Sequence, residues 1–256
     1  MNDFNFNQFI EFHQGNVPLI LSIPHGGDLK YFAIPDRING ILGKDSKTIE
    51  LGKELINYIE KYHRKSNNSI ISPSYVISLI HRSKIDFNRE EIDAFNQKSY
   101  EARFIYNFYH QKLNEFISTN LQAFNSSFLI DIHGFERNKR PEGYRDVDLV
   151  LGSNNLGTLY AFPIPKKHWG KNIRGKIVKA FNKEGILIAP GHHLRKEYVL
   201  TGGYITTKYG ASNILNSQSI QIEFSDRVRI SDYSLRKLVL KTLARTLYDN
   251  YIFKYI

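Results

Sequence analysis

The chain has 256 residues, 41% of them hydrophobic and 13% aromatic, so it can bury a core, and extended disorder and collagen-like structure are excluded. It contains no cysteine, so disulfide bonds, thiolate zinc sites and cysteine nucleophiles are excluded, and any metal must be held by histidine or carboxylate side chains. The formal net charge of +10 favours an anionic partner, either nucleic acid or an acidic small molecule.

Short apolar runs alternate with longer segments of helical period along the chain. This alternation predicts an α/β fold of three αβα layers, with a mostly parallel or mixed central sheet between helices. We predict strands at residues 17–24, 74–80, 128–132, 147–151 and 219–224. We predict helices at residues 46–63, 100–121, 172–183 and 233–251. No internal repeat or Pro/Ser-rich linker is found, so a single domain over residues 1–256 is expected.

The N-terminal residues 1–12 are not typical of a secretory signal, because they carry two acidic residues, no lysine or arginine, and no long apolar core. No part of the sequence approaches the roughly 18 uninterrupted apolar residues of a membrane span. We therefore expect a soluble cytoplasmic protein with no membrane contact.

Two predicted strands end in a histidine followed by glycine. His25-Gly26-Gly27 follows the first strand, and His133-Gly134 follows residues 128–132. Carboxyl ends of parallel strands meet at one edge of a sheet, where glycines let a ligand approach the backbone. Either histidine alone is equally well explained by a tight turn, but two such elements in one chain indicate a metal site.

A catalytic zinc ion usually takes three protein ligands, so His25 and His133 need a carboxylate partner. Asp28 and Asp45 are both suitably placed, although Asp28 is also typical of a loop and Asp45 of a helix N-cap. Spacing alone does not decide whether Asp28 or Asp45 is the third metal ligand. Asp131 lies two residues before His133 and shares its side of the strand, as expected of a carboxylate that fixes the tautomer of a metal-binding imidazole.

Two further segments carry candidate groups. In Asp86-Phe87-Asn88-Arg89, the guanidinium can hold a substrate carboxylate while Asp86 and Asn88 orient it, although a surface ion pair explains the segment equally well. Glu223 lies within the apolar strand 219–224, where an acid costs stability unless it is paired or functional. A carboxylate in a partly desolvated cleft suits the base that hydrolysis at a metal requires.

Taken in order, these elements resemble the N-formylglutamate amidohydrolase family, zinc hydrolases related in fold to zinc carboxypeptidases and cell-wall zinc amidases. Each motif is short, but together they cover most of the chain. Besides the segments above, the resemblance rests on Phe12-His13-Gln14-Gly15, Leu151-Gly152-Ser153, Gly202-Gly203-Tyr204-Ile205-Thr206, Tyr209-Gly210 and Gln221-Ile222-Glu223. The implied fold is that of the zinc exopeptidases and phosphorylase/hydrolase-like proteins.

The resemblance also implies one zinc ion per chain and a role for each candidate residue. The implied zinc ligands are His25, Asp45 and His133, which prefers Asp45 to Asp28. The implied catalytic residues are Glu223 and Arg89. The substrate would contact Asn88, Arg89, Gly202 and Gly203, and the residues behind the metal ligands would be Asp86 and Asp131.

The implied reaction is hydrolysis of the amide of an N-acylated acidic amino acid, a small anionic substrate such as N-formyl-L-glutamate. Two positions depart from the family pattern. Gly134 stands where serine usually follows the metal-binding histidine, and Thr207 stands where an arginine commonly follows the Gly-Gly segment. Because that arginine is a candidate substrate contact, its absence leaves the substrate open. Lys208 and Arg145 are candidates to replace it.

Two alternative functions stay open. A related zinc amidase or carboxypeptidase would act on a peptide or a peptidoglycan fragment. A basic nucleic-acid-binding protein without catalysis would use residues 164–208, which hold ten lysines and arginines against two glutamates. No zinc-finger spacing or RNA-binding signature is present, so nucleic acid is the weaker expectation. The positive charge is better explained as a field that attracts a small dianionic substrate.

Overall fold

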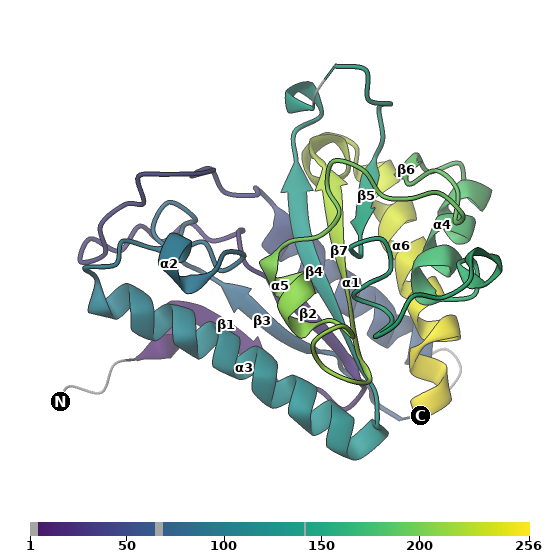
Figure 1. The fold of residues 1–256 in the computed structure, drawn as a ribbon, viewed down its shortest axis with the longest axis horizontal. Coiled ribbons are helices and arrows are strands. Elements are labelled where there is room, and N and C mark those ends of the chain that lie inside the picture. Colours follow the sequence, from purple (N-terminus) through teal and green to yellow (C-terminus); the bar gives the residue numbers. More distant parts are fainter. Residues whose placement is uncertain (1–4, 65–68, 141) are drawn as a thin grey trace.

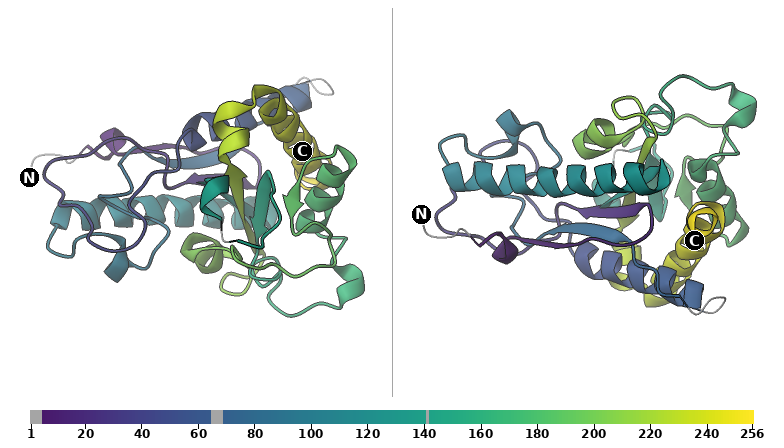
Figure 2. Two further views of the ribbon diagram at one scale, coloured as in Figure 1. Left: turned by 90° about the horizontal axis from the view of Figure 1, so that it is seen from above. Right: turned by 90° about the horizontal axis from the view of Figure 1, so that it is seen from below.

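The computed structural model describes residues 5–64, 69–140 and 142–256 (Figure 1). Their fold is α/β, with a seven-stranded mixed sheet in the described part and helices on both of its faces (Figure 2), which confirms the predicted fold class. Residues 1–4, part of the N-terminal segment that is not typical of a secretory signal, lie outside the described residues. None of the described helices combines the length and apolar character needed to cross a membrane.

The sheet places four parallel strands at its centre. Its strands are β1 (Ile10–His13), β2 (Leu19–Ile23), β3 (Ser74–Ser78), β4 (Ser127–Phe135), β5 (Leu149–Gly152), β6 (Ile188–Ala189) and β7 (Ser217–Ser225). Their order is β1-β3-β2-β4-β7-β5-β6. Strands β3, β2, β4 and β7 are parallel, whereas β1 is antiparallel to β3 and β5 is antiparallel to β7. The carboxyl ends of β2, β4 and β7 therefore meet at one edge.

Helices cover the two faces of the sheet in separate groups (Figure 2). One face carries α1 (Thr48–Arg64), α4 (Ile173–Lys183) and α6 (Tyr233–Asn250). The other carries α2 (Glu91–Ala94), the long α3 (Tyr100–Phe124) and α5 (Tyr204–Tyr209). Strand side chains alternate between the two groups: Leu19, Leu21 and Ile23 pack toward α1, whereas Ile20 packs toward α3.

The alternation of β4 sets the side on which the candidate residues lie. Phe128, Ile130 and Ile132 belong to the core under α1 and α6, while Leu129 belongs to the core under α3. Asp131 and His133 continue the Leu129 series, as their spacing predicts. They therefore face the α3 side of the sheet at its carboxyl edge.

Several predicted boundaries change. The strand expected to end at Ile132 continues to Phe135, because β4 keeps its pairing with β7 through the last register pair, Phe135 with Ser225. His133 and Gly134 therefore lie inside a strand rather than in a turn after it. Strands β1 and β6 are additional short elements at the two edges of the sheet.

Candidate metal centre

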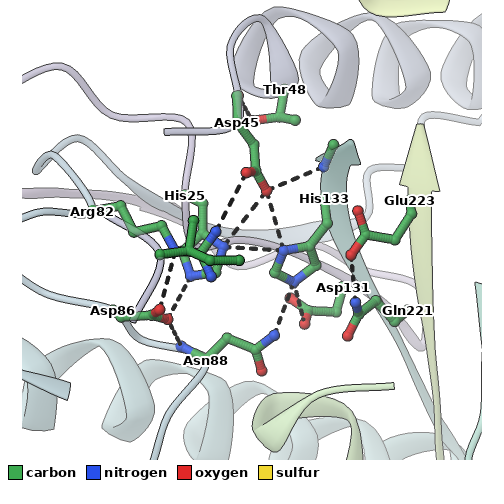
Figure 3. Close-up of polar contacts among 12 residues, drawn as sticks. His25, Asp45, Thr48, Arg82, Asp86, Asn88, Asp131, His133, Gln221 and Glu223 are labelled. Atoms are coloured by element: carbon green, nitrogen blue, oxygen red, sulfur yellow. Dashed lines mark hydrogen bonds and ion pairs between the residues drawn. The ribbon is translucent and has the colours of Figure 1, made fainter. Parts of the chain in front are cut away.

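The two strand-associated histidines and Asp45 come together at the carboxyl edge of the sheet (Figure 3). His25 follows β2, His133 belongs to β4, and Asp45 precedes α1; all three are buried. The Nδ1 atoms of the two histidines lie 3.1 Å apart. Oδ2 of Asp45 lies 3.5 Å from Nδ1 of His25 and 3.3 Å from Nδ1 of His133. Three segments distant in sequence thus direct one ligand atom each to a common point.

A carboxylate holds the other ring nitrogen of each histidine. Nε2 of His25 donates to Oδ1 of Asp86 at 2.6 Å, and Nε2 of His133 donates to Oδ2 of Asp131 at 2.8 Å. An ionised carboxylate only accepts hydrogen bonds, so each Nε2 carries a proton, and in the neutral imidazole each Nδ1 is left with a lone pair. This is the arrangement by which a carboxylate orients a metal-binding imidazole.

The donor set fits a zinc ion. Two imidazole nitrogens and one carboxylate oxygen are a common protein ligand set for catalytic zinc. Two Nδ1 lone pairs facing each other at 3.1 Å repel unless a cation or a proton lies between them. The candidate ligand atoms of His25, Asp45 and His133 all lie within 4.8 Å of one another.

The electrostatics of the centre also favour positive charge at this point. Burial by itself lowers the pKa of His133, but the Asp131 carboxylate, with Asp45 and Glu223, raises it well above its ordinary value. Burial raises the pKa of Asp45, but its hydrogen bonds and charge interactions with His133 and His25 outweigh burial and lower it well below its ordinary value. The carboxylates around the histidines therefore stabilise a cation.

Asp45 rather than Asp28 stands beside the histidines. The Asp28 side chain is 80% exposed and forms an ion pair with Lys44. The Asp45 carboxylate does not act as an N-cap in the described contacts, because it contacts His25, His133, Gly134 and Arg82 rather than a backbone N–H of α1. The carboxylate instead accepts a hydrogen bond from the backbone N–H of Gly134 at 3.1 Å.

Glu223 lies on the strand next to His133. The two residues are register partners in the parallel pair β4 and β7, and the Glu223 side chain faces the centre (Figure 3). Nε2 of Gln221 donates to Oε1 of Glu223 at 2.7 Å. Burial raises the pKa of Glu223; His133 opposes this rise and Asp45 adds to it. A buried carboxyl beside the ligand atoms is well placed to exchange a proton with a group bound there.

The segment from Asp86 to Arg89 is anchored by Phe87, which is fully buried and stacks on Tyr109 of α3 at 4.4 Å between ring centroids. The main histidine contact of Asp86 is with His25, at 2.6 Å. Its contact with Arg89 is longer, with 3.8 Å between Nε of Arg89 and Oδ2 of Asp86. The Arg89 side chain is half exposed, at 50%, and lines the cavity over the centre. It is free to meet a ligand there.

Asn88 joins this segment to the Gly202-Gly203 loop. Its Oδ1 accepts from the backbone N–H of Ile205 at 2.8 Å, and its Nδ2 lies 3.3 Å from Nε2 of His133. A β-carbon at Gly203 would stand 2.7 Å from Cγ of Asn88, so the loop approaches this closely only with glycine. Asn88 and both glycines line the cavity. The carbonyl oxygen of Asn88 is engaged by Ile205, whereas its Nδ2 faces the protonated Nε2 of His133, which cannot accept a hydrogen bond.

A cavity of about 510 Å³ lies over the centre. Its lining includes Asp45, His133 and Glu223 at the base. Five basic side chains also line it: Lys44, Arg82, Arg89, Lys139 and Arg140. Lys208 and Arg145, the two suggested replacements for the family arginine, are not among its lining residues. Lys208 instead lies over the rings of Tyr204 and Tyr209.

Sequence reasoning missed Arg82. Its Nε lies 3.0 Å from Oδ2 of Asp86, and its Nη1 lies 3.6 Å from Oδ1 of Asp45, so the guanidinium bridges the two carboxylates on either side of His25. Its position shortly after strand 74–80 is the signal that could have found it, because side chains that follow parallel strands gather at one edge of the sheet.

Sequence reasoning also missed a buried chain of hydroxyls behind Asp131. Oγ of Ser22 donates to Oδ1 of Asp131 at 2.7 Å, and Oη of Tyr109 lies 2.8 Å from the same Oγ. The chain links α3 to β4 through β2. Its only sequence signal is that Ser22 is the one polar residue in an otherwise apolar strand.

Arg229 is a further residue that the sequence did not single out. It is almost fully buried in the π-helical turn Arg227–Ser231. Its guanidinium donates to the carbonyls of Ser46, Phe135 and Phe224. Those carbonyls lie one or two residues after Asp45, His133 and Glu223, respectively. One side chain thus connects the segments that carry Asp45, His133 and Glu223.

Comparisons with known structures give the same fold. An N-formylglutamate amidohydrolase from Ralstonia eutropha matches with a TM-score of 0.64 at 15% sequence identity, over 97% of this chain and 99% of that chain. A gene product from Agrobacterium tumefaciens matches with a TM-score of 0.58 at 12% identity, over 94% of this chain and 95% of that chain. No protein-family model and no curated protein sequence matches. The α/β fold is thus similar to that of N-formylglutamate amidohydrolase.

Proposed function

We propose that this protein is a zinc-dependent hydrolase that cleaves the amide bond of an N-acylated acidic amino acid, with N-formyl-L-glutamate as the first substrate to test. The observation that carries the proposal is the convergence of Nδ1 of His25, Nδ1 of His133 and Oδ2 of Asp45 beside a cavity that Asp45, His133 and basic side chains line. The fold similarity to an N-formylglutamate amidohydrolase supports the same reaction class. We propose that the chain acts as a single cytoplasmic domain on a small anionic substrate.

His25, Asp45 and His133 would hold the zinc ion, while Asp86 and Asp131 keep the two imidazoles in the required tautomer. A bound zinc ion supplies a Lewis acid that polarises the amide carbonyl and lowers the pKa of water toward about 7. Glu223 would take a proton from the attacking water and deliver it to the nitrogen of the leaving amine. Its burial next to His133 supports this role.

Arg89 would hold the substrate carboxylate. Its guanidinium is half exposed at the cavity, and its one ion pair among the described residues is a 3.8 Å contact with Asp86, so it can form a bidentate pair with a ligand. The Gly202-Gly203 loop and Asn88 would form the adjoining wall of the substrate site. Holding the substrate in this way orders the amide beside Glu223 before the reaction.

The test combines metal analysis with one substitution. Protein purified without chelators should contain about one zinc ion per chain. Glu223→Gln should retain the metal and lose about 10²- to 10⁴-fold in kcat on the substrate that the wild type cleaves. Glu90→Gln, which alters an exposed acid without a capping hydrogen bond, should leave both quantities unchanged.

Formyl, acetyl and peptidyl derivatives of acidic amino acids should be assayed side by side. Preference for the small acyl groups supports the proposal, whereas preference for the peptidyl compounds identifies a peptide or peptidoglycan amidase. Protein that binds no metal, and gains no activity when zinc is added, would show that the proposal is wrong. Full turnover by Glu223→Gln would show that Glu223 is not the general base.

A further inference from the structure

A second cavity, of about 650 Å³, adjoins the cavity over the metal centre. Two residues, Arg140 and Val199, line both cavities. Val150 lines the second cavity and is the register partner of Glu223 in the antiparallel pair β5 and β7. Directly opposed residues of such a pair point to the same face, with α-carbons about 4.5–5.5 Å apart. The second cavity therefore begins one strand away from the proposed base.

Positive charge surrounds the second cavity. Its basic lining residues are Arg140, Arg145, Arg195 and Lys196. Its acidic lining residue, Glu197, is fully occupied by the protein. The Glu197 carboxylate lies 2.7 Å from Nε of Arg174 and accepts hydrogen bonds from the backbone N–H groups of Ser153 and Asn155. The charge that faces the cavity is therefore positive.

Arg140 stands at the boundary between the two cavities with an unused donor. Its Nη1 is buried and has no hydrogen-bond partner among the described residues. Its guanidinium lies 5.4 Å from the ring centroid of Phe135, which itself lines the cavity over the metal centre. A buried donor without an acceptor is unfavourable, so this position favours a ligand that supplies an anionic oxygen.

We propose that the second cavity binds a remote anionic group of the substrate, so that the preferred substrate is an N-acylated acidic peptide rather than a single acylated amino acid. This inference rests on the proposed amide hydrolysis and specifies its substrate class. The volumes of the two cavities are consistent with a peptide substrate. Each volume lies within the range of about 300–1,000 Å³ that is typical of pockets for drug-sized ligands. Apolar walls formed by Val147, Val150 and Pro190 suit the aliphatic part of such a peptide.

The first experiment measures binding and does not depend on turnover. Titration calorimetry with the unlabelled peptides tri-glutamate and tri-glutamine should give at least about tenfold tighter binding of tri-glutamate, a preference that added salt weakens. The double variant Arg145→Gln/Arg195→Gln should lose about tenfold in affinity for tri-glutamate and less than about twofold for tri-glutamine.

The matched control is Lys176→Gln/Lys183→Gln, which removes the same charge from exposed positions of α4 outside the cavity lining. It should leave both affinities within about twofold of the wild type, because the lost charges are screened from the cavity by solvent. Equal affinity of the wild type for the two peptides would contradict the proposed second site. Equal loss of tri-glutamate affinity in the two double variants would contradict it as well.

The second experiment compares kcat/KM for N-formyl-Glu, N-formyl-Glu-Glu and N-formyl-Glu-Gln. The second compound should be the best substrate, and its advantage over the third should shrink in Arg145→Gln/Arg195→Gln. Selective tri-glutamate binding without cleavage of any acyl compound would contradict the proposed hydrolysis and leave the anion site standing. Cleavage of all three at equal rates, without selective binding, would contradict the second site and leave the proposed hydrolysis standing.

Discussion

The guanidinium of Arg229 occupies the space beside Gly134 that a side chain would need. A β-carbon built at position 134 would stand 2.8 Å from Cδ and 2.5 Å from Cζ of Arg229. Gly134 directly follows His133, and its backbone N–H donates to Asp45. The glycine at this position, where the resembled family usually has serine, is therefore matched to the arginine behind it.

Gly134→Ser should destabilise the protein by about 1–3 kcal/mol, because the new side chain overlaps a buried guanidinium held by several hydrogen bonds. The free energy of unfolding can be measured by urea denaturation. Gly43→Ser is the control, since a β-carbon at that position meets no atom of the described residues within 4 Å. Equal stability of the two variants would contradict the packing argument.

Arg229→Gln should lower zinc affinity by about 10- to 100-fold, as loss of groups that support metal ligands commonly does. The substitution removes this donor from the buried carbonyl of Phe224 and the part-buried carbonyl of Ser46. Competition with a chromogenic chelator measures the affinity. Arg227→Gln, two residues away and partly exposed, should bind zinc like the wild type. An unchanged affinity in Arg229→Gln would limit Arg229 to a role in stability.

Asp45→Asn should abolish stoichiometric zinc binding, whereas Asp28→Asn should leave it intact. The reason is that Asp45 directs Oδ2 to both histidines, while Asp28 is exposed and pairs with Lys44. Elemental analysis of the two purified variants provides the measurement. If Asp28→Asn lost zinc and Asp45→Asn retained it, Asp28 rather than Asp45 would be the carboxylate ligand.

Stability should fall in acid because of His110, which lies on α3 away from the candidate metal ligands. Burial, with a smaller contribution from Lys208, lowers the pKa of His110 from 6.5 to about 3. The unfolded chain therefore binds a proton between pH 6.5 and about 3 that the folded chain does not, and stability is lost as the pH falls through this range. At pH 5 the loss amounts to about 2 kcal/mol relative to pH 7.

His110→Gln should remove that share of the pH dependence. Urea denaturation at pH 7 and pH 5 should show a smaller loss of stability for the variant than for the wild type, by about 2 kcal/mol. Between pH 7 and pH 8 the difference in free energy of unfolding between His110→Gln and the wild type should stay constant. Identical losses on acidification would show that His110 is not the group responsible.

The sequence alone predicted the layered fold, because hydrophobic period is a local property of the chain. Leu19, Leu21 and Ile23 alternate with Ile20 in the structure as their spacing predicts. Period two likewise placed Asp131 beside His133. The end of β4 could not be predicted in this way, because its last residues are held by pairing with β7, which is more than eighty residues away.

The sequence by itself determined the kind of ligand chemistry available: without cysteine, a metal here can be held only by histidines and carboxylates. The tertiary structure decided which carboxylate joins His25 and His133, since Asp28 and Asp45 are equally acceptable by spacing. It also decided that Asp86 contacts His25 and that Arg229 fills the space beside Gly134. The physical reason is that such contacts depend on distances between segments far apart in the chain, whereas residue type and local period depend only on the sequence around each position.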